Sequence, residues 1–257
     1  MKPNPWISNL AVYEPGKPML ELARQLGLES EAGIVKLASN ENAWGPSPKA
    51  QAAMVAAAAQ MHLYPDGSAY YLRRELARRN GLDIEQVVVG NGSNELLEFL
   101  AHVYLDHDTN IVMADRAFVV YALLARAYQA DVIRVPMRDL THDLDALLAA
   151  VTPKTRLVFV ANPNNPTGTK VTPAAVSRFL QNLPEHVVAV FDEAYFEFLD
   201  PEDQPALLAE LQGAAPRPNL YVLRTFSKAY GLAGLRLGYA FAAPESARLL
   251  QRVRQPF

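Results

Sequence analysis

A lysine stands in the segment of this chain whose residue types are best suited to chemistry. Lys228 follows the apolar run 220–223, with Ser227 directly before it and Arg236 further along. A desolvated lysine beside another cation loses its proton more readily, and its neutral amine can attack a carbonyl to form a Schiff base. A serine hydroxyl and an arginine can together hold a phosphate. Most lysines are solvated surface charges, so this segment alone leaves both interpretations open.

Polar segments also follow three other apolar runs of the chain. They are residues 90–95 (Gly-Asn-Gly-Ser-Asn-Glu), 162–168 (Asn-Pro-Asn-Asn-Pro-Thr-Gly) and 192–195 (Asp-Glu-Ala-Tyr). In open α/β sheets, ligands bind outside the carboxyl ends of the strands. Together with Lys228, these segments make one composite site a better interpretation than four unrelated loops.

Gly90 and Gly92 allow a sharp turn into a helix whose free N-terminal amides could bind phosphate. Ser93 and Asn94 add side-chain donors at the same place. Taken alone, this segment is better interpreted as an ordinary helix cap, because serine and asparagine are common capping residues. Only its position beside the other strand ends favours a phosphate site.

Three other residues are ambiguous when each is taken alone. Asp192 ends an apolar strand, where a carboxylate either faces solvent, caps a turn or holds a cation. Asn165 precedes a proline, which is a common turn signal. Phe118 could cover a planar ligand, although core packing is the stronger interpretation. Asp192 and Glu193 would point to opposite faces, so they are not expected to form a carboxylate pair.

Short apolar runs alternate with helical stretches along most of the chain, which indicates a mostly parallel sheet covered on both faces. We therefore predict an α/β fold, a three-layer αβα sandwich around seven strands. The strands are expected at 86–89, 111–113, 132–135, 157–160, 187–191, 220–223 and 237–241. Helices are expected at 18–26, 49–60, 68–79, 93–105, 118–128, 144–151, 173–183 and 244–254.

The composition excludes several classes of function. Half of the 257 residues are apolar and the net charge is -3, so we expect no nucleic-acid or membrane partner. The chain has no cysteine, and its five histidines lack the spacing of metal ligands, so we predict no metal site. No run is long enough to span a membrane and no signal peptide is visible, which favours a soluble cytoplasmic protein.

Taken together, these segments resemble pyridoxal-phosphate enzymes of the aspartate aminotransferase type, fold type I. Within that group the chain is similar to the histidinol-phosphate aminotransferases. The resemblance runs in order over nearly the whole chain and rests on segments 14–18, 36–42, 45–48, 64–67, 90–95, 162–168, 192–195 and 225–236. Any one of them is weak, but the set at this spacing is specific for the fold type and less specific for the substrate.

The resemblance implies a role for each residue around the cofactor ring. Lys228 would form the Schiff base with pyridoxal 5'-phosphate and later shuttle a proton, and Asp192 would pair with the protonated pyridine nitrogen. Asn165 and Tyr195 would hydrogen-bond the phenolic oxygen of the ring, and Phe118 would stack on the ring.

Further roles concern the phosphate and the substrate. The resemblance assigns the cofactor phosphate to Ser93, Asn94, Ser227 and Arg236. Tyr64 would reach the phosphate of a neighbouring subunit, which implies a homodimer. Tyr13, in the N-terminal arm, would lie on the substrate side.

The implied reaction moves the amino group of histidinol phosphate to 2-oxoglutarate, giving imidazole-acetol phosphate and glutamate in histidine biosynthesis. An aromatic aminotransferase and a threonine-phosphate decarboxylase of the same fold are alternatives, as is a truncated, non-catalytic remnant.

Two features depart from the family pattern. Ala43 replaces the usual proline, and the chain ends at Phe257, where family members continue into a small domain. We therefore expect an arm and short helix (1–38), a large cofactor domain (39–257), no small domain, and a truncated product or fragment.

Overall fold

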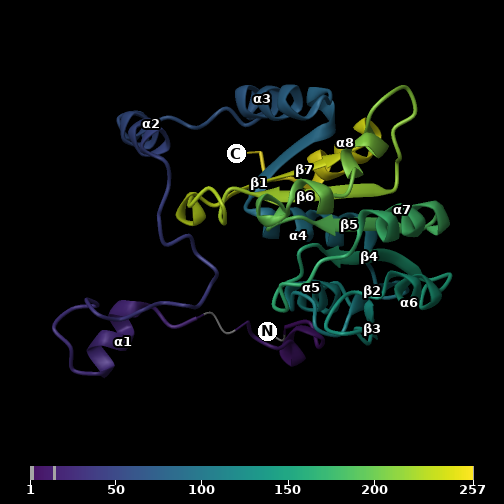
Figure 1. Ribbon diagram of the computed structural model, residues 1–257, viewed down its shortest axis with the longest axis horizontal. Helices are drawn as coiled ribbons and strands as arrows, with labels where there is room; N and C mark the ends of the chain where they lie inside the picture. Colours follow the sequence, from purple (N-terminus) through teal and green to yellow (C-terminus); the bar gives the residue numbers. More distant parts are fainter. Residues whose placement is uncertain (1–2, 14–15, 257) are drawn as a thin grey trace.

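A seven-stranded sheet forms the centre of the computed structural model, which describes residues 3–13 and 16–256 (Figure 1). Its strands are β1 (Val87–Asn91), β2 (Asn110–Ala114), β3 (Asp131–Val135), β4 (Thr155–Ala161), β5 (Val188–Asp192), β6 (Leu220–Thr225) and β7 (Leu237–Ala242). The order is β1-β7-β6-β5-β4-β2-β3, and only β7 runs antiparallel to its neighbours. The predicted mostly parallel sheet is confirmed. Of the residues used for the resemblance, Glu14 and Pro15 lie outside the described part, as does Phe257.

Helices cover both faces of the sheet, so the predicted three layers are confirmed. The eight α-helices of the described residues are α1 (Met19–Gln25), α2 (Pro48–Ala58), α3 (Tyr70–Asn80), α4 (Ser93–Tyr104), α5 (Val120–Ala127), α6 (Leu144–Ala149), α7 (Pro173–Asn182) and α8 (Pro244–Val253). Helices α4, α5 and α8 share one apolar cluster with the sheet, and α3, α6 and α7 share the other. None of these helices is long and apolar enough to cross a membrane.

The two apolar clusters follow from the alternation of side chains along each strand. Val158 of β4 belongs to one cluster, and its neighbour Phe159 belongs to the other. The same alternation separates Val87 from Val88 in β1. Successive strand residues point to opposite faces, so a strand that is apolar throughout needs cover on both sides.

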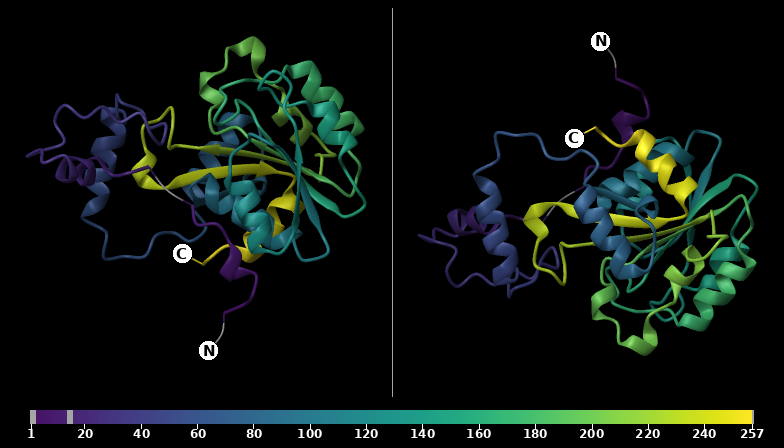
Figure 2. Two further views of the ribbon diagram at one scale, coloured as in Figure 1. Left: turned by 90° about the horizontal axis from the view of Figure 1, so that it is seen from below. Right: turned by 90° about the horizontal axis from the view of Figure 1, so that it is seen from above.

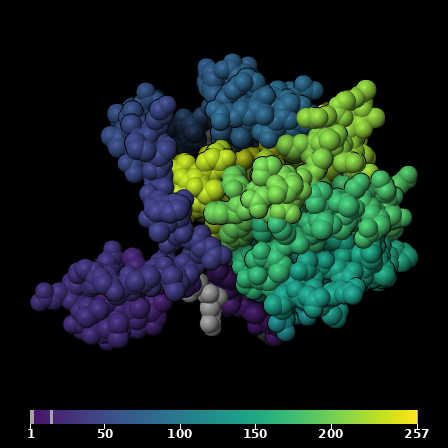
Figure 3. Space-filling model, in the orientation of Figure 1, coloured from purple at the N-terminus to yellow at the C-terminus, as the bar shows by residue number. Residues whose placement is uncertain are grey.

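Residues 16–38 and helix α2 extend away from this body, whereas residues 3–13 lie beside it (Figures 1 and 2). In the space-filling view residues 16–38 and α2 project from the compact body (Figure 3). No residue of α2 is buried. The helix begins through local chemistry, because Ser47 accepts a hydrogen bond from the Ala50 amide and Pro48 occupies the first helical position.

Strand register brings the polar segments to one edge. Ala161, Asp192 and Leu223 are partners across β4, β5 and β6. Because these strands are parallel, their carboxyl ends lie side by side, and the segments that follow them share the same edge. The antiparallel strand β7 begins at this edge, so Arg236, just before it, lies there too.

Gly238 allows β7 to lie directly against the start of α4. An added Cβ there would overlap the Ser93 amide and the Gly92 carbonyl carbon, both of which belong to the backbone.

We expect Gly238→Ala to lower the free energy of unfolding by about 1–3 kcal/mol, as overpacking does. Urea denaturation measures this change. Gly234→Ala is the matched control, because no atom lies within 4 Å of its added Cβ. Equal midpoints for the two variants would contradict this packing argument.

Candidate active site

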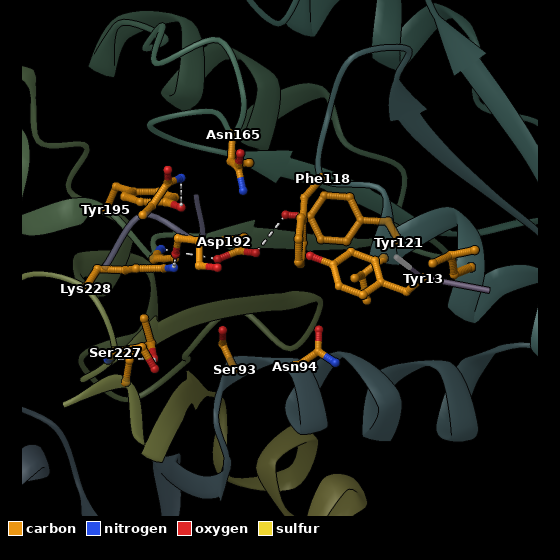
Figure 4. A pocket seen from close by; sticks show the side chains of 18 of the residues that line it. Tyr13, Ser93, Asn94, Phe118, Tyr121, Asn165, Asp192, Tyr195, Ser227 and Lys228 are labelled. Carbon is orange, nitrogen blue, oxygen red and sulfur yellow. Dashed lines mark hydrogen bonds between the residues drawn. The ribbon is translucent and has the colours of Figure 1, made fainter. Parts of the chain in front are cut away.

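The segments meet around one cavity of about 920 Å³ at the carboxyl edge of the sheet (Figure 4). Ten of the predicted site residues line it: Tyr13, Ser93, Asn94, Phe118, Asn165, Asp192, Tyr195, Ser227, Lys228 and Arg236. Tyr64 does not line it, and this side chain is 81% exposed. The fold therefore brings together four strand ends and part of the N-terminal arm.

Lys228 is half-buried at the end of β6, and its amine lies inside the cavity. Its Nζ donates a hydrogen bond to the Ser39 carbonyl oxygen at 2.8 Å and lies 5.7 Å from the centre of the Tyr195 ring. Burial lowers the pKa of Lys228, and the Arg236 charge lowers it further, although Glu41 and Asp192 oppose both effects. This lysine has the environment that favours a neutral, nucleophilic amine.

Asp192 is buried at the end of β5 and faces the same cavity. Its Oδ2 accepts a hydrogen bond from the Tyr121 hydroxyl at 2.7 Å, and its Oδ1 accepts one from the Ala194 amide at 3.2 Å. Burial raises the pKa of Asp192, while these two hydrogen bonds and the Lys228 charge lower it. The carboxylate therefore makes a local turn contact and also presents negative charge to the cavity.

Glu193, the next residue, belongs to a different environment. Its Oε2 accepts a hydrogen bond from Arg224 Nε at 2.8 Å, and burial raises its pKa to about 7. Glu193 does not line the cavity, so the predicted separation of the two carboxylates is confirmed. Within the described residues, no cluster of three or more histidine, aspartate or glutamate side chains could hold a metal ion.

One end of the cavity has the groups of an anion-binding site. Helix α4 starts after Gly92, whose φ of 78° favours glycine, and no side chain caps its first amides. Arg236 Nη1 donates to Ser227 Oγ at 3.5 Å, and its Nη2 donates to the Asn91 carbonyl oxygen at 3.3 Å. A Cβ at Gly92 would overlap this guanidinium. Free helix amides, a hydroxyl and a guanidinium suit a phosphate.

Among the other residues that line the cavity are three that the sequence did not single out for a role: Ser39, Asn40 and Tyr121. The Asn40 side-chain amide donates to the Tyr195 hydroxyl oxygen at 2.9 Å. Ser39 and Asn40 both have left-handed backbone, with φ of 72° and 50°, and such strain is common at functional sites. The contacts of Ser39 and Asn40 join distant parts of the chain. The only sequence signal for these two residues was their position in the segment 36–42, which carries part of the family resemblance.

Phe118 packs against the core, as one of its two interpretations predicted, and it also lines the cavity. Its ring meets that of Tyr121 edge to face, with centres 5.6 Å apart and planes at 86°. The side-chain amide of Asn164 donates to the Arg116 carbonyl oxygen at 3.0 Å, which ties the loop carrying Asn165 to the segment leading to Phe118.

The sequence matches the family model for aminotransferase class I and II over residues 32–257. The chain belongs to this family. It is 48% identical over 251 residues to a histidinol-phosphate aminotransferase of Moorella thermoacetica, covering 98% of this chain and 64% of that protein. A histidinol-phosphate aminotransferase 2 of Pseudomonas aeruginosa is 50% identical over 253 residues, covering 98% and 68%. This chain thus spans about two thirds of the length of these relatives.

A solved structure agrees with the sequence comparison. The histidinol-phosphate aminotransferase of Sinorhizobium meliloti, determined in complex with pyridoxal-5'-phosphate, superposes with a TM-score of 0.88 at 31% identity. The match covers 98% of this chain and 66% of that one. The fold described above is therefore shared with about two thirds of that histidinol-phosphate aminotransferase.

The Arg236 charge should favour loss of the Lys228 proton in this member of the family, in addition to the effect of burial. We expect the Lys228 labelling rate with acetic anhydride to rise with pH at a midpoint below the ordinary lysine value of 10.5. Arg236→Gln should move this midpoint upward, because a neighbouring cation disfavours the protonated amine. Peptide mass spectrometry measures labelling, and Arg248→Gln on the outer side of α8 is the control. An unchanged or lower midpoint in Arg236→Gln would contradict the prediction.

Proposed function

We propose that the protein is a pyridoxal-phosphate-dependent aminotransferase that converts histidinol phosphate and 2-oxoglutarate to imidazole-acetol phosphate and glutamate, in histidine biosynthesis. One observation carries the proposal: Lys228 and Asp192 share a cavity that has an anion-binding cup at one end. The names of the relatives support the substrate.

The residues fit the cofactor in charge and in shape. Its phosphate would occupy the cup formed by Ser93, Asn94, Ser227 and Arg236, where the glycine at position 92 leaves room for the guanidinium. Its ring would lie between the strand end carrying Asp192 and the Phe118 ring. The buried carboxylate matches a protonated pyridine nitrogen, and the half-buried Lys228 matches an aldehyde carbon.

When bound, the cofactor supplies an electron sink for the negative charge that develops on the substrate carbon. The side chains of this chain do the rest. The Asp192 carboxylate would accept a hydrogen bond from the protonated pyridine nitrogen, and Lys228 Nζ would take up the proton that the substrate carbon gives up. Tyr195 accepts a hydrogen bond from Asn40, so its own hydroxyl hydrogen is free to point to the phenolic oxygen of the ring, beside Asn165.

Substrate recognition and assembly belong to the same proposal. Tyr13 lines the cavity from the N-terminal arm, on the side where the substrate would enter. Exposed apolar side chains gather in the segment 44–71, including Trp44 at 96% and Val55 at 76% exposure, which supports a homodimer. In such a dimer Tyr64 would reach the phosphate of the partner's site. The division at residues 38 and 39 and the cytoplasmic location stay predictions.

The first test is cofactor capture. Added pyridoxal phosphate should give a near-visible absorption band, and borohydride should fix the cofactor to the Lys228 peptide. Lys228→Ala should lose the band and the label, whereas Lys154→Ala, at an exposed position, should keep both. An unchanged band in Lys228→Ala would refute the assignment of the lysine.

The substrate is tested on the same sample. Histidinol phosphate should convert the bound cofactor to its amine form, and 2-oxoglutarate should restore the band. Phenylalanine and threonine phosphate test the two alternatives of the same fold. A response to either of these without one to histidinol phosphate would overturn the proposed substrate, and no response to any amine would favour the non-catalytic remnant.

A mixing experiment tests the proposed dimer. Tyr64→Ala and Lys228→Ala should each capture cofactor poorly at limiting concentration. A mixed dimer of the two has one site with both an intact Lys228 and the partner's Tyr64. We therefore expect mixing to restore up to about half of the wild-type borohydride label per lysine-containing chain, following the statistics of subunit exchange. Label that does not increase on mixing, in a sample shown by sedimentation to be dimeric, would refute the shared site.

A further inference from the structure

Tyr121 is a fully buried phenol whose side chain lines the cavity. It lies in α5, one helical turn after Phe118, and its hydroxyl donates to Asp192 Oδ2 at 2.7 Å (Figure 4). Burial and the nearby carboxylate raise its pKa well above 10.0, so the phenol keeps its hydrogen. The hydrogen bond therefore has a fixed direction, with Tyr121 as donor and Asp192 as acceptor.

Two aromatic contacts hold the Tyr121 ring in place. It stacks on Phe159 of β4, with centres 4.5 Å apart and planes at 5°, and Phe118 meets it edge to face. Both geometries are favourable for aromatic pairs. The ring cannot turn without breaking the stack, so the position of its hydroxyl is set by β4 and by the start of α5.

The contacts of Tyr121 determine how Asp192 is presented. One carboxylate oxygen is held by Tyr121 and the other by the Ala194 amide, so the plane of the carboxylate is fixed from two sides. Burial alone would favour a protonated, neutral carboxyl group. A hydrogen bond donated to the charged form counteracts burial, and the Tyr121 bond is the largest effect in this direction.

We infer that Tyr121 is a positioning residue that acts through Asp192: it orients the carboxylate and keeps it ionised, so that a bound pyridine nitrogen retains its proton. The same side chain sets the Phe118 ring, and so one residue of α5 couples the ring-stacking side to the charged edge of the site. This inference rests on the proposed cofactor function.

Tyr121→Phe removes only the hydroxyl group and keeps the stack. The dissociation constant for pyridoxal phosphate, measured by absorbance titration, should rise about tenfold, which is ~1.4 kcal/mol. The ¹⁵N resonance of bound cofactor labelled at the ring nitrogen should move at neutral pH toward the value of an unprotonated pyridine. A purely structural role would not move the nitrogen resonance.

Tyr221→Phe is the matched control. Tyr221 is also fully buried, and its hydroxyl makes hydrogen bonds to Tyr104 at 2.8 Å and to the Ser246 carbonyl oxygen at 2.9 Å. It does not line the cavity. We expect this variant to lose thermal stability without changing the dissociation constant or the ¹⁵N resonance. If Tyr121→Phe behaves as this control does, the inference is wrong.

A second modification tests the inference if Tyr121→Phe does not fold. Site-specific 3-fluorotyrosine at position 121 keeps the shape of the ring and makes the hydroxyl a stronger donor. The ¹³C carboxyl signal of Asp192, assigned with Asp192→Asn, should then titrate at a lower pH in the cofactor-free protein. An unchanged titration would overturn the inference. Failure of the proposed function has a different signature, because the wild-type protein would then capture no cofactor on Lys228.

Discussion

A carboxylate that is buried at the end of a central strand is the constraint on which this site depends. Asp192 loses its hydration when β5 is covered by helices, and an ionised carboxyl group in that position needs donors or a cation. The Tyr121 hydroxyl and the Ala194 amide provide two donors, and Lys228 provides a nearby charge. The lysine and the carboxylate thus adjust each other, since each opposes the effect of burial on its neighbour.

The packing of α4 and β7 determines the other end of the cavity. Gly238 lets the strand lie against the start of the helix, and Gly92 leaves space for the Arg236 guanidinium. The start of α4, which no side chain caps, therefore lines the cavity together with a cation that could neutralise an anion. An anion-binding cup on one side and a carboxylate on the other make the cavity polar at both ends, which suits an elongated ligand with a phosphate and a basic ring nitrogen.

The N-terminal segment connects the site with the projecting part of the chain. Ser39 accepts a hydrogen bond from Lys228, and Asn40 donates one to Tyr195, so two consecutive left-handed residues lie against the centre of the cavity. Beyond them the chain leaves the body and carries exposed apolar side chains into solvent. A partner that covers these side chains would also stabilise Ser39 and Asn40, and binding at the site and association would then be coupled.

The sequence by itself determined the layered sheet and the strand ends that form the site. Apolar runs bounded by turn residues predicted all seven strands. The central strands are the clearest case, because strands that are buried on both faces need continuous apolar side chains. Lys228 and Asp192 could be named because four polar segments follow such runs and together resemble the cofactor site of a known family, although each residue taken alone was ambiguous. Tyr121 could not, because a tyrosine in an amphipathic helix has the pattern of a core residue. Its hydrogen bond to Asp192, like those of Ser39 and Asn40, joins elements distant in sequence, and only tertiary packing decides which of them meet.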